Sequence, residues 1–129
     1  MNRPVNVLVV DDEEDVVVLF QQMFRRETRR GEVSLTFALS AADALSHLAD
    51  HRDGIDVVLS DINMPGMDGL DLLREIKASP PPLPVCMMTA YSNDDYRAKA
   101  AAYGCDEYLI KPLDFSSLKL TIASYLPQA

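Results

Sequence analysis

Five short apolar runs, each followed by a segment with helical periodicity, constrain the fold of this chain more than any other feature. The runs occupy residues 5–10, 33–38, 55–60, 84–90 and 107–110. Strict alternation of strands and helices predicts an α/β fold in which helices cover both faces of a parallel sheet. We expect one domain over residues 1–129, a flavodoxin-like (βα)5 doubly wound sandwich. The strand order 2-1-3-4-5 is an expectation by analogy with that fold.

Capping residues and breakers predict where the helices begin and end. Apolar residues at helical spacing, followed by an arginine-rich turn, predict one first helix over residues 16–30 that ends at Gly31. Suitable N-cap residues precede three other helices: Ser40, Asp68 and Asp114. Residues 79–84 are rich in proline and predict a stiff connection to the fourth strand.

The fourth helix differs from the others in its composition. Ser92 and Asp95 open it, Gly104 ends it, and large apolar contacts come only from Tyr96 and Tyr103. Four of its other positions are alanines: Ala98, Ala100, Ala101 and Ala102. Alanine favours a helix but buries little surface, so we expect this helix to be held weakly against the sheet.

Five polar residues stand at or just after the carboxyl ends of predicted strands: Asp11, Asp12, Asp61, Thr89 and Lys111. In a parallel α/β sheet these ends share one edge, where ligands bind. A cluster of carboxylates is costly unless a hard cation lies in it, and Mg²⁺ prefers oxygen ligands. Without metal, at least one of these carboxyls should have a raised pKa. The ammonium and hydroxyl groups can hold phosphoryl oxygens, so the cluster predicts a site where a phosphoryl group is attached to an aspartate.

Charge and cysteine content exclude several classes of protein. The formal net charge of −8 disfavours direct binding to nucleic acid, which requires a basic surface. Cys86 and Cys105 match no zinc or CxxC spacing and suit buried, inert thiols. The longest apolar run is far too short to span a membrane, and the N-terminus lacks a signal-peptide core. We therefore expect a cytoplasmic protein without membrane contact.

Taken in order along the chain, these motifs resemble the receiver domain of two-component response regulators. The resemblance rests on the Asp11-Asp12 pair, on Asp61 with the loop Asn-Met-Pro-Gly-Met-Asp-Gly that follows it, and on Thr89 before a small residue. It is completed by Lys111 before a proline, and it covers essentially the whole chain. The resemblance implies a signalling switch that is phosphorylated by a histidine kinase or a phosphotransfer protein, and not an enzyme acting on other substrates.

The resemblance also implies a role for each site residue. Asp61 would be the phosphoacceptor, and Mg²⁺ or Mn²⁺ would be held by Asp12, Asp61 and the backbone carbonyl of Asn63, with Asp11 acting through water. Thr89, Lys111 and the backbone N–H of Ala90 would contact phosphoryl oxygens. Tyr108 would be the switch aromatic that moves with Thr89. A cis peptide bond is expected between Lys111 and Pro112.

Phosphorylation should then change the face that contains Tyr96, Tyr103 and Tyr108, where a dimer or an output partner would bind. Two other functions are less compatible with the chain. A haloacid-dehalogenase-like phosphatase needs an Asp-x-Asp pattern after the first strand, and a flavodoxin needs a phosphate loop rich in Ser, Thr and Gly. The adjacent pair Asp11-Asp12 breaks the first pattern, and four acidic residues stand where a flavodoxin would have its phosphate loop. A stand-alone regulator and a receiver from a longer protein both remain compatible with this sequence.

Overall fold

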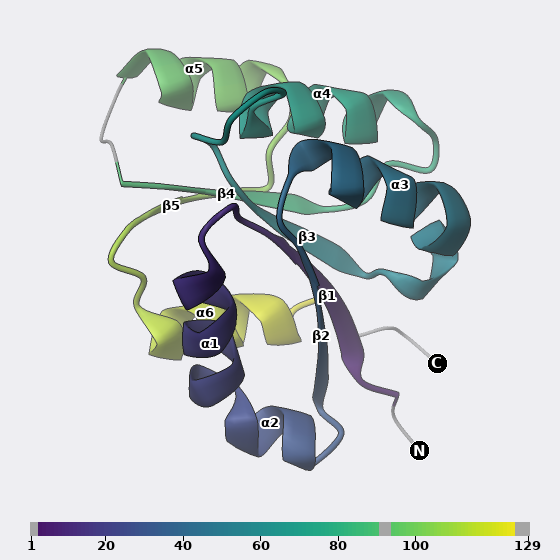
Figure 1. Ribbon diagram of the computed structural model, residues 1–129, viewed down its shortest axis with the longest axis vertical. Helices are drawn as coiled ribbons and strands as arrows, with labels where there is room; N and C mark the ends of the chain where they lie inside the picture. The colour runs from purple at the N-terminus through teal and green to yellow at the C-terminus, as the bar shows by residue number, and fades with distance from the viewer. Residues whose placement is uncertain (1–2, 91–93, 126–129) are drawn as a thin grey trace.

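The computed structural model describes residues 3–90 and 94–125, and they form one parallel sheet flanked by helices (Figure 1). The strands are β1 (Val5–Val10), β2 (Val33–Ala38), β3 (Val57–Asp61), β4 (Val85–Thr89) and β5 (Glu107–Ile110). Their order is β2-β1-β3-β4-β5, and every neighbouring pair is parallel. The predicted architecture and strand order are therefore confirmed.

The third strand begins later than predicted and includes Asp61. Ile55 donates its N–H to the carbonyl of Arg52 at 3.1 Å in a tight turn, and Asp56 makes the first backbone hydrogen bond to β1, from its N–H to the carbonyl of Asn6 at 2.8 Å. Pairing with β1 starts at Val57, opposite Val7. The strand consequently runs one residue further than predicted and ends at the carboxylate that the sequence analysis singled out.

The helices are α1 (Glu14–Met23), α2 (Arg25–Arg29), α3 (Ala41–His51), α4 (Gly69–Ala78), α5 (Asp94–Ala102) and α6 (Phe115–Ala123), with a 3-10 turn, η1 (Arg52–Gly54), after α3. All three predicted N-caps are confirmed. The side chains of Ser40 and Asp68 each accept a backbone N–H three residues on, at 3.0 and 2.9 Å, and Asp114 accepts two. Gly104 follows α5 with a φ of +88°, as expected of a glycine that ends a helix.

The prediction of one continuous helix over residues 16–30 is wrong, because the chain bends at Phe24. The backbone there has φ −103° and ψ 12°, outside the helical region, and it separates α1 from the five-residue α2. The Phe24 ring is fully buried, 5.9 Å from Phe20 and 6.0 Å from Phe115. This aromatic packing is a tertiary contact, and helical periodicity alone does not reveal it. The exposed arginines of α2 then point into solvent at the end of the molecule.

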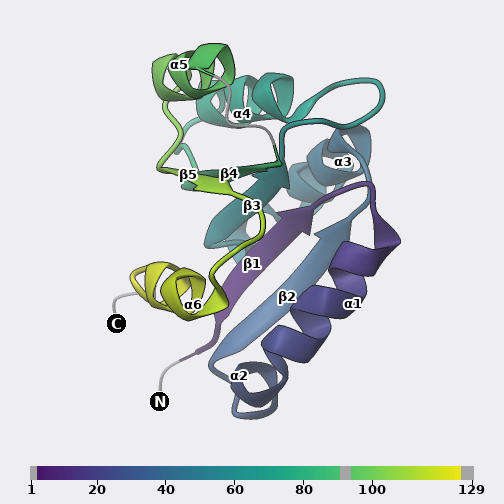
Figure 2. The same cartoon turned by 90° about the vertical axis from the view of Figure 1, so that its left-hand side faces the viewer.

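Each face of the sheet has its own hydrophobic core. Figures 1 and 2 show α3, α4 and α5 on one face and α1 and α6 on the other. The first core joins Leu8 and Val58 to the apolar sides of α3 and α4, and the second joins Val7 and Leu59 to α1 and α6. Because successive strand residues face opposite sides, nearly every side chain of β1, β3 and β4 is buried.

Helix α5 is the least firmly anchored of the helices that cover the first face. Ala100 is its only fully buried residue, whereas α4 buries Leu70, Leu72, Leu73 and Ile76. Tyr96 packs against the core only in part. The predicted weak packing of this helix is confirmed for its described residues; Ser92, which was expected to open it, lies outside the described part of the chain.

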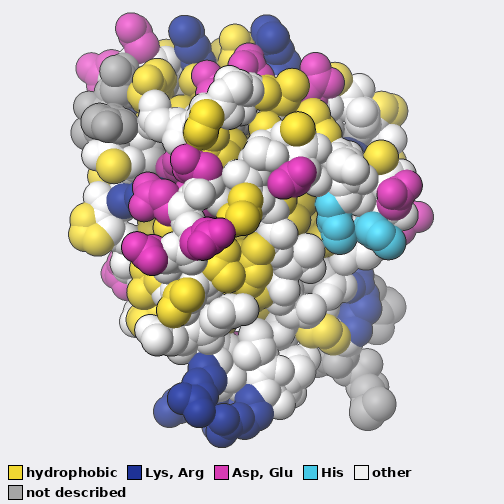
Figure 3. All heavy atoms as spheres, in the orientation of Figure 1, with side chains coloured by type: hydrophobic (Ala, Val, Ile, Leu, Met, Phe, Trp, Pro, Cys, Tyr) yellow, Lys and Arg dark blue, Asp and Glu magenta, His cyan; other side chains and the backbone are white. Residues whose placement is uncertain are grey.

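One end of the molecule carries a cluster of basic side chains. Figure 3 shows acidic side chains gathered over the middle of one face and a cluster of basic side chains at the end where α2 lies.

Cys86 and Cys105 are free thiols, and burial raises the pKa of Cys86 to about 12, which suits an inert role. Among the helices of the described residues, none has the length and apolar character needed to cross a bilayer.

Candidate functional site

The predicted site residues meet at the carboxyl edge of the sheet. Asp61 is the last residue of β3 and Thr89 the last of β4, while Asp11 and Asp12 directly follow β1. Lys111 directly follows β5, and its N–H donates to the carbonyl of Thr89 at 2.8 Å. Five residues that are up to a hundred positions apart in the chain therefore lie at one place because of the strand order.

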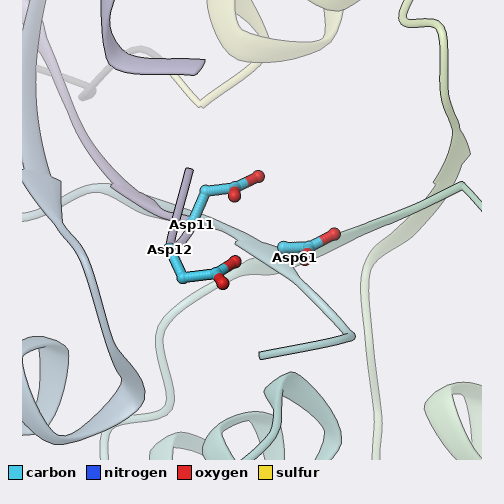
Figure 4. Close-up of side chains that lie close together, drawn as sticks. All are labelled: Asp11, Asp12 and Asp61. Carbon is cyan, nitrogen blue, oxygen red and sulfur yellow. The ribbon is translucent and has the colours of Figure 1, made fainter. Parts of the chain in front are cut away.

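Three carboxylates form the centre of the site. One oxygen atom from each of Asp11, Asp12 and Asp61 lies within 4.8 Å of the others. Figure 4 shows the three side chains close together and extending toward the same side. Asp11 and Asp61 are buried, with 2% and 5% of their surface exposed, whereas Asp12 is exposed. A cation at this place would be reached from solvent on the Asp12 side.

Lys111 partly neutralises the two buried carboxylates. Its Nζ lies 3.0 Å from Oδ2 of Asp11 and 3.1 Å from Oδ1 of Asp61. The other Asp11 oxygen, Oδ1, accepts the backbone N–H of Glu13 at 3.0 Å. Burial lowers the pKa of Lys111, but the hydrogen bond to Asp11 and the charges of both carboxylates outweigh it, and the pKa is raised. Lys111 therefore remains an ammonium group over the whole physiological range.

Among the three carboxyls of the site, Asp61 has a clearly raised pKa. Burial is the largest cause and raises its pKa from 3.8 to about 6; Lys111 opposes the rise, and Asp11 and Asp12 add to it. The predicted raised pKa is confirmed, with burial contributing more than repulsion between the carboxylates. A partly desolvated carboxylate is also a more reactive nucleophile than one in water.

The donor atoms of the site fit Mg²⁺. All candidate ligands are oxygens, which hard cations prefer. Both Asp11 oxygens already have partners, but within the described residues the Asp12 carboxylate makes no hydrogen bond or ion pair. The backbone carbonyl of Asn63 is likewise unused by the backbone hydrogen bonds of that part of the chain. These contacts favour Asp12 and the Asn63 carbonyl as direct ligands and Asp11 as an indirect one, as the sequence analysis expected.

Gly69, the first residue of α4, packs directly against the end of β3. A Cβ atom at this position would overlap the backbone carbonyl of Asp61. The Gly69 N–H donates to the carbonyl of Ile62 at 2.8 Å and so holds the helix start against the end of β3. Only glycine allows this approach.

Thr89 and Tyr108 connect the site to α5. Thr89 is fully buried, and its hydroxyl donates to Oδ1 of Asn63 at 3.4 Å. Tyr108 on β5 is half-buried, and the guanidinium carbon of Arg97 lies 4.7 Å from the centre of its ring. The Tyr108 hydroxyl is enclosed and has no hydrogen-bond partner among the described residues. The peptide bond before Pro112 is cis, as predicted.

Two side-chain roles were not predicted from the sequence. The sequence analysis assigned only the backbone of Asn63, but its amide nitrogen also donates to the Tyr96 hydroxyl on α5, at 3.2 Å. Arg97, which covers Tyr108, was not singled out at all. The sequence does show that Asn63 stands two residues after Asp61 and that Arg97 follows Tyr96. Their partners, however, depend on how the loop and α5 are placed.

An apolar groove of about 370 Å³ lies beside Lys111, between α1 and the segment that follows β5. Leu19 and Met23 line it and are 43% and 39% exposed. These two residues belong to the apolar stripe from which α1 was predicted, yet they face this groove and solvent. Of the other residues of that stripe, Phe20 and Phe24 are buried in the core and Val16 is partly buried.

Comparisons with known proteins agree with this geometry. The profile of the "Response regulator receiver domain" family matches residues 7–123. The "Transcriptional regulatory protein ZraR" of Klebsiella oxytoca is 42% identical over 95% of this chain, and the "DNA-binding transcriptional regulator NtrC" of Proteus hauseri is 43% identical over 84% of it. The chain spans only 26% and 22% of these two proteins. The crystal structure of the signal receiver domain of an HD domain-containing protein from Pseudomonas fluorescens Pf-5 has a TM-score of 0.84 and 31% identity. That likeness covers 95% of this chain and 94% of the other.

Proposed function

Because this chain belongs to the response regulator receiver domain family, we propose that Asp61 is the residue through which it receives a phosphoryl group and switches state. The observation that carries the proposal is the position of the Asp61 carboxylate. It lies at the end of β3, 3.1 Å from the Lys111 ammonium and within a cluster of carboxylate oxygens that suits Mg²⁺. The donor would be a histidine kinase or a phosphotransfer protein.

In the transfer step, an Asp61 oxygen attacks the phosphorus atom of a phosphohistidine. A new P–O bond forms while the P–N bond to the imidazole breaks, and the imidazole leaves with the electron pair. Mg²⁺, when bound by Asp12, Asp61 and the Asn63 carbonyl, would neutralise charge on the phosphoryl oxygens. No proton needs to leave Asp61 if its carboxyl is already ionised, which a pKa of about 6 permits near pH 7.

The residues around Asp61 would hold the product. Lys111 now shares its ammonium between Asp11 and Asp61, and one of these contacts can pass to a phosphoryl oxygen. The Thr89 hydroxyl and the Ala90 N–H stand at the end of the neighbouring strand β4 and would donate to the remaining oxygens. Catalysis would be limited to the domain's own phosphorylation and dephosphorylation. The apolar groove beside Lys111 offers contact area to a phosphodonor protein that approaches this edge.

The rest of the proposal concerns the cell and the longer protein. Since ZraR and NtrC are about four times as long as this chain, we propose that the domain controls an output module of a transcriptional regulator. The free thiols and the histidine-kinase donor fit a cytoplasmic location.

Acetyl phosphate tests the phosphoacceptor directly. In the presence of Mg²⁺ the chain should gain the mass of one phosphoryl group, and peptide mapping should place it on Asp61. Chelation of the metal or the change Asp61→Asn should abolish the gain. The matched control Asp53→Asn, an exposed carboxylate in η1, should label like the unchanged protein. Labelling that survives Asp61→Asn would refute the proposal.

A further inference from the structure

The side chain of Asn63 bridges the end of β4 and helix α5. Its Oδ1 accepts the Thr89 hydroxyl at 3.4 Å, and its Nδ2 donates to the Tyr96 hydroxyl at 3.2 Å. Asn63 stands two residues after Asp61, so one amide group connects the neighbourhood of the phosphoacceptor to the weakly anchored helix.

The Thr89 contact, at 3.4 Å, is longer than the usual O–H···O range of about 2.5–3.0 Å, and the Tyr96 contact, at 3.2 Å, lies at the long end of the N–H···O range of about 2.7–3.2 Å, so neither holds strongly by itself. The Thr89 hydroxyl has one hydrogen to donate. A phosphoryl oxygen on Asp61 carries charge and is a stronger acceptor than a neutral amide oxygen. If Thr89 donates to it, that hydrogen is withdrawn from Asn63.

We infer that Asn63 and Tyr96 are positioning residues of the switch: through the Asn63 amide, Tyr96 holds the Thr89 hydroxyl away from Asp61 and holds α5 against the β3–α4 loop in the unphosphorylated domain. This inference rests on the proposed function, and it names the contact by which that function is regulated. Asn63 thereby has two separate uses, its backbone carbonyl toward the metal and its side chain toward α5.

The packing of α5 gives this contact its importance. Only Ala100 of the helix is fully buried and Tyr96 packs on the core in part, so the Asn63–Tyr96 hydrogen bond adds to a small apolar anchor. Arg97 is adjacent to Tyr96 and covers the Tyr108 ring at 4.7 Å. Movement of the helix that breaks the Tyr96 contact also shifts Arg97 and uncovers Tyr108, whose enclosed hydroxyl could then reach a partner. The two tyrosines would respond together, because Tyr96 and the Arg97 that covers Tyr108 are consecutive residues of α5.

The expected effect follows from linkage. Loss of one neutral hydrogen bond changes an equilibrium between two states by about two- to ten-fold. A ligand that binds the released state gains the same factor in affinity, because binding and the conformational equilibrium are coupled. Breaking the Asn63–Tyr96 contact should therefore tighten binding of a phosphoryl mimic, whereas ordinary damage to the fold would weaken it.

The test uses the whole chain and the change Tyr96→Phe, which removes the hydroxyl and keeps the ring. Tyr103→Phe is the matched control: it lies just beyond the same helix, and its hydroxyl makes no hydrogen bond within the described residues. Beryllofluoride with saturating Mg²⁺ stands in for the phosphoryl group and is titrated by calorimetry. Tyr96→Phe should bind about two- to ten-fold more tightly than the unchanged protein, and Tyr103→Phe should bind equally.

Amide exchange provides a second measurement. Without ligand, residues 94–102 of Tyr96→Phe should exchange faster than in the unchanged protein, while α3 stays the same. Equal affinity and equal exchange in the two variants would overturn the inference, as would weaker binding by Tyr96→Phe. If the unchanged protein binds no beryllofluoride and Asp61 is not labelled by acetyl phosphate, the proposed function fails and the inference falls with it.

Discussion

Replacing the buried Asp61 by asparagine should stabilise the protein, and the gain should depend on pH. The carboxyl is 5% exposed, and its pKa is raised from 3.8 to about 6, chiefly by burial. Asparagine has nearly the same shape but carries no charge at any pH. It therefore mimics the protonated carboxyl, which is buried at less cost than the charged form.

The sign and size follow from the two pKa values. Since the folded state binds the Asp61 proton more tightly than the unfolded chain does, stability falls as pH rises between about 4 and 6, and then levels off. The two pKa values, 3.8 and about 6, differ by about two units, and each unit of difference is worth about 1.4 kcal/mol. The charged form therefore destabilises the folded state by on the order of 3 kcal/mol. At about pH 4 most of it is absent, so the stability difference between Asp61→Asn and the unchanged protein should grow by about 2 kcal/mol from pH 4 to pH 8.

Urea unfolding followed by circular dichroism at both pH values measures this difference, since the chain has no tryptophan for a fluorescence signal. A chelator keeps the site free of metal. Asp53→Asn removes an exposed carboxylate and shows how much of the change comes from net charge alone. A difference that is the same at both pH values, or that shrinks as pH rises, would refute the assignment of a buried, destabilising charge to Asp61.

Three other predictions examine the parts of the site separately. Lys111→Met removes the main charge that lowers the pKa of the proposed phosphoacceptor, so that pKa should rise further above 6 in a carbon-detected NMR titration; a fall would contradict the ion-pair geometry. Gly69→Ala should destabilise the fold by about 1–3 kcal/mol in urea unfolding because its methyl group meets backbone, whereas Gly54→Ala, with open space around it, should not. Asp12→Ala should weaken Mg²⁺ binding in calorimetry more than Asp11→Ala does, and the reverse order would exchange their assigned roles.

The sequence was sufficient to predict the architecture because its signals are local and repeated. Alternating apolar runs, three N-cap side chains and a terminal glycine each act within a few residues, and each was confirmed. The bend at Phe24 was missed for the opposite reason. Its cause is the packing of that ring against Phe115, which is far away in the chain, and no local pattern reports such a contact.

The place where the site residues meet could also be predicted from the sequence. Its acidic and basic residues stand at strand ends, and a parallel sheet brings strand ends together whatever the details of the loops. The side-chain contacts of Asn63 and Arg97 required the actual path of the β3–α4 loop and the position of α5. The raised pKa of Asp61, about 6, likewise depends mainly on burial, which the order of residues does not specify.

The contact between Gly69 and the Asp61 carbonyl gives the domain a stiff side and a compliant side. On the stiff side, α4 touches the backbone of Asp61 without any intervening side chain and buries four large residues in the core. On the compliant side, α5 rests on one buried alanine, the partly buried Tyr96 ring and the hydrogen bond from Asn63 to its hydroxyl. A displacement at Asp61 cannot compress the first side, because closely packed backbone does not yield. Under the proposed function it would be taken up by the second, so that a change in charge at Asp61 would move α5 rather than α4.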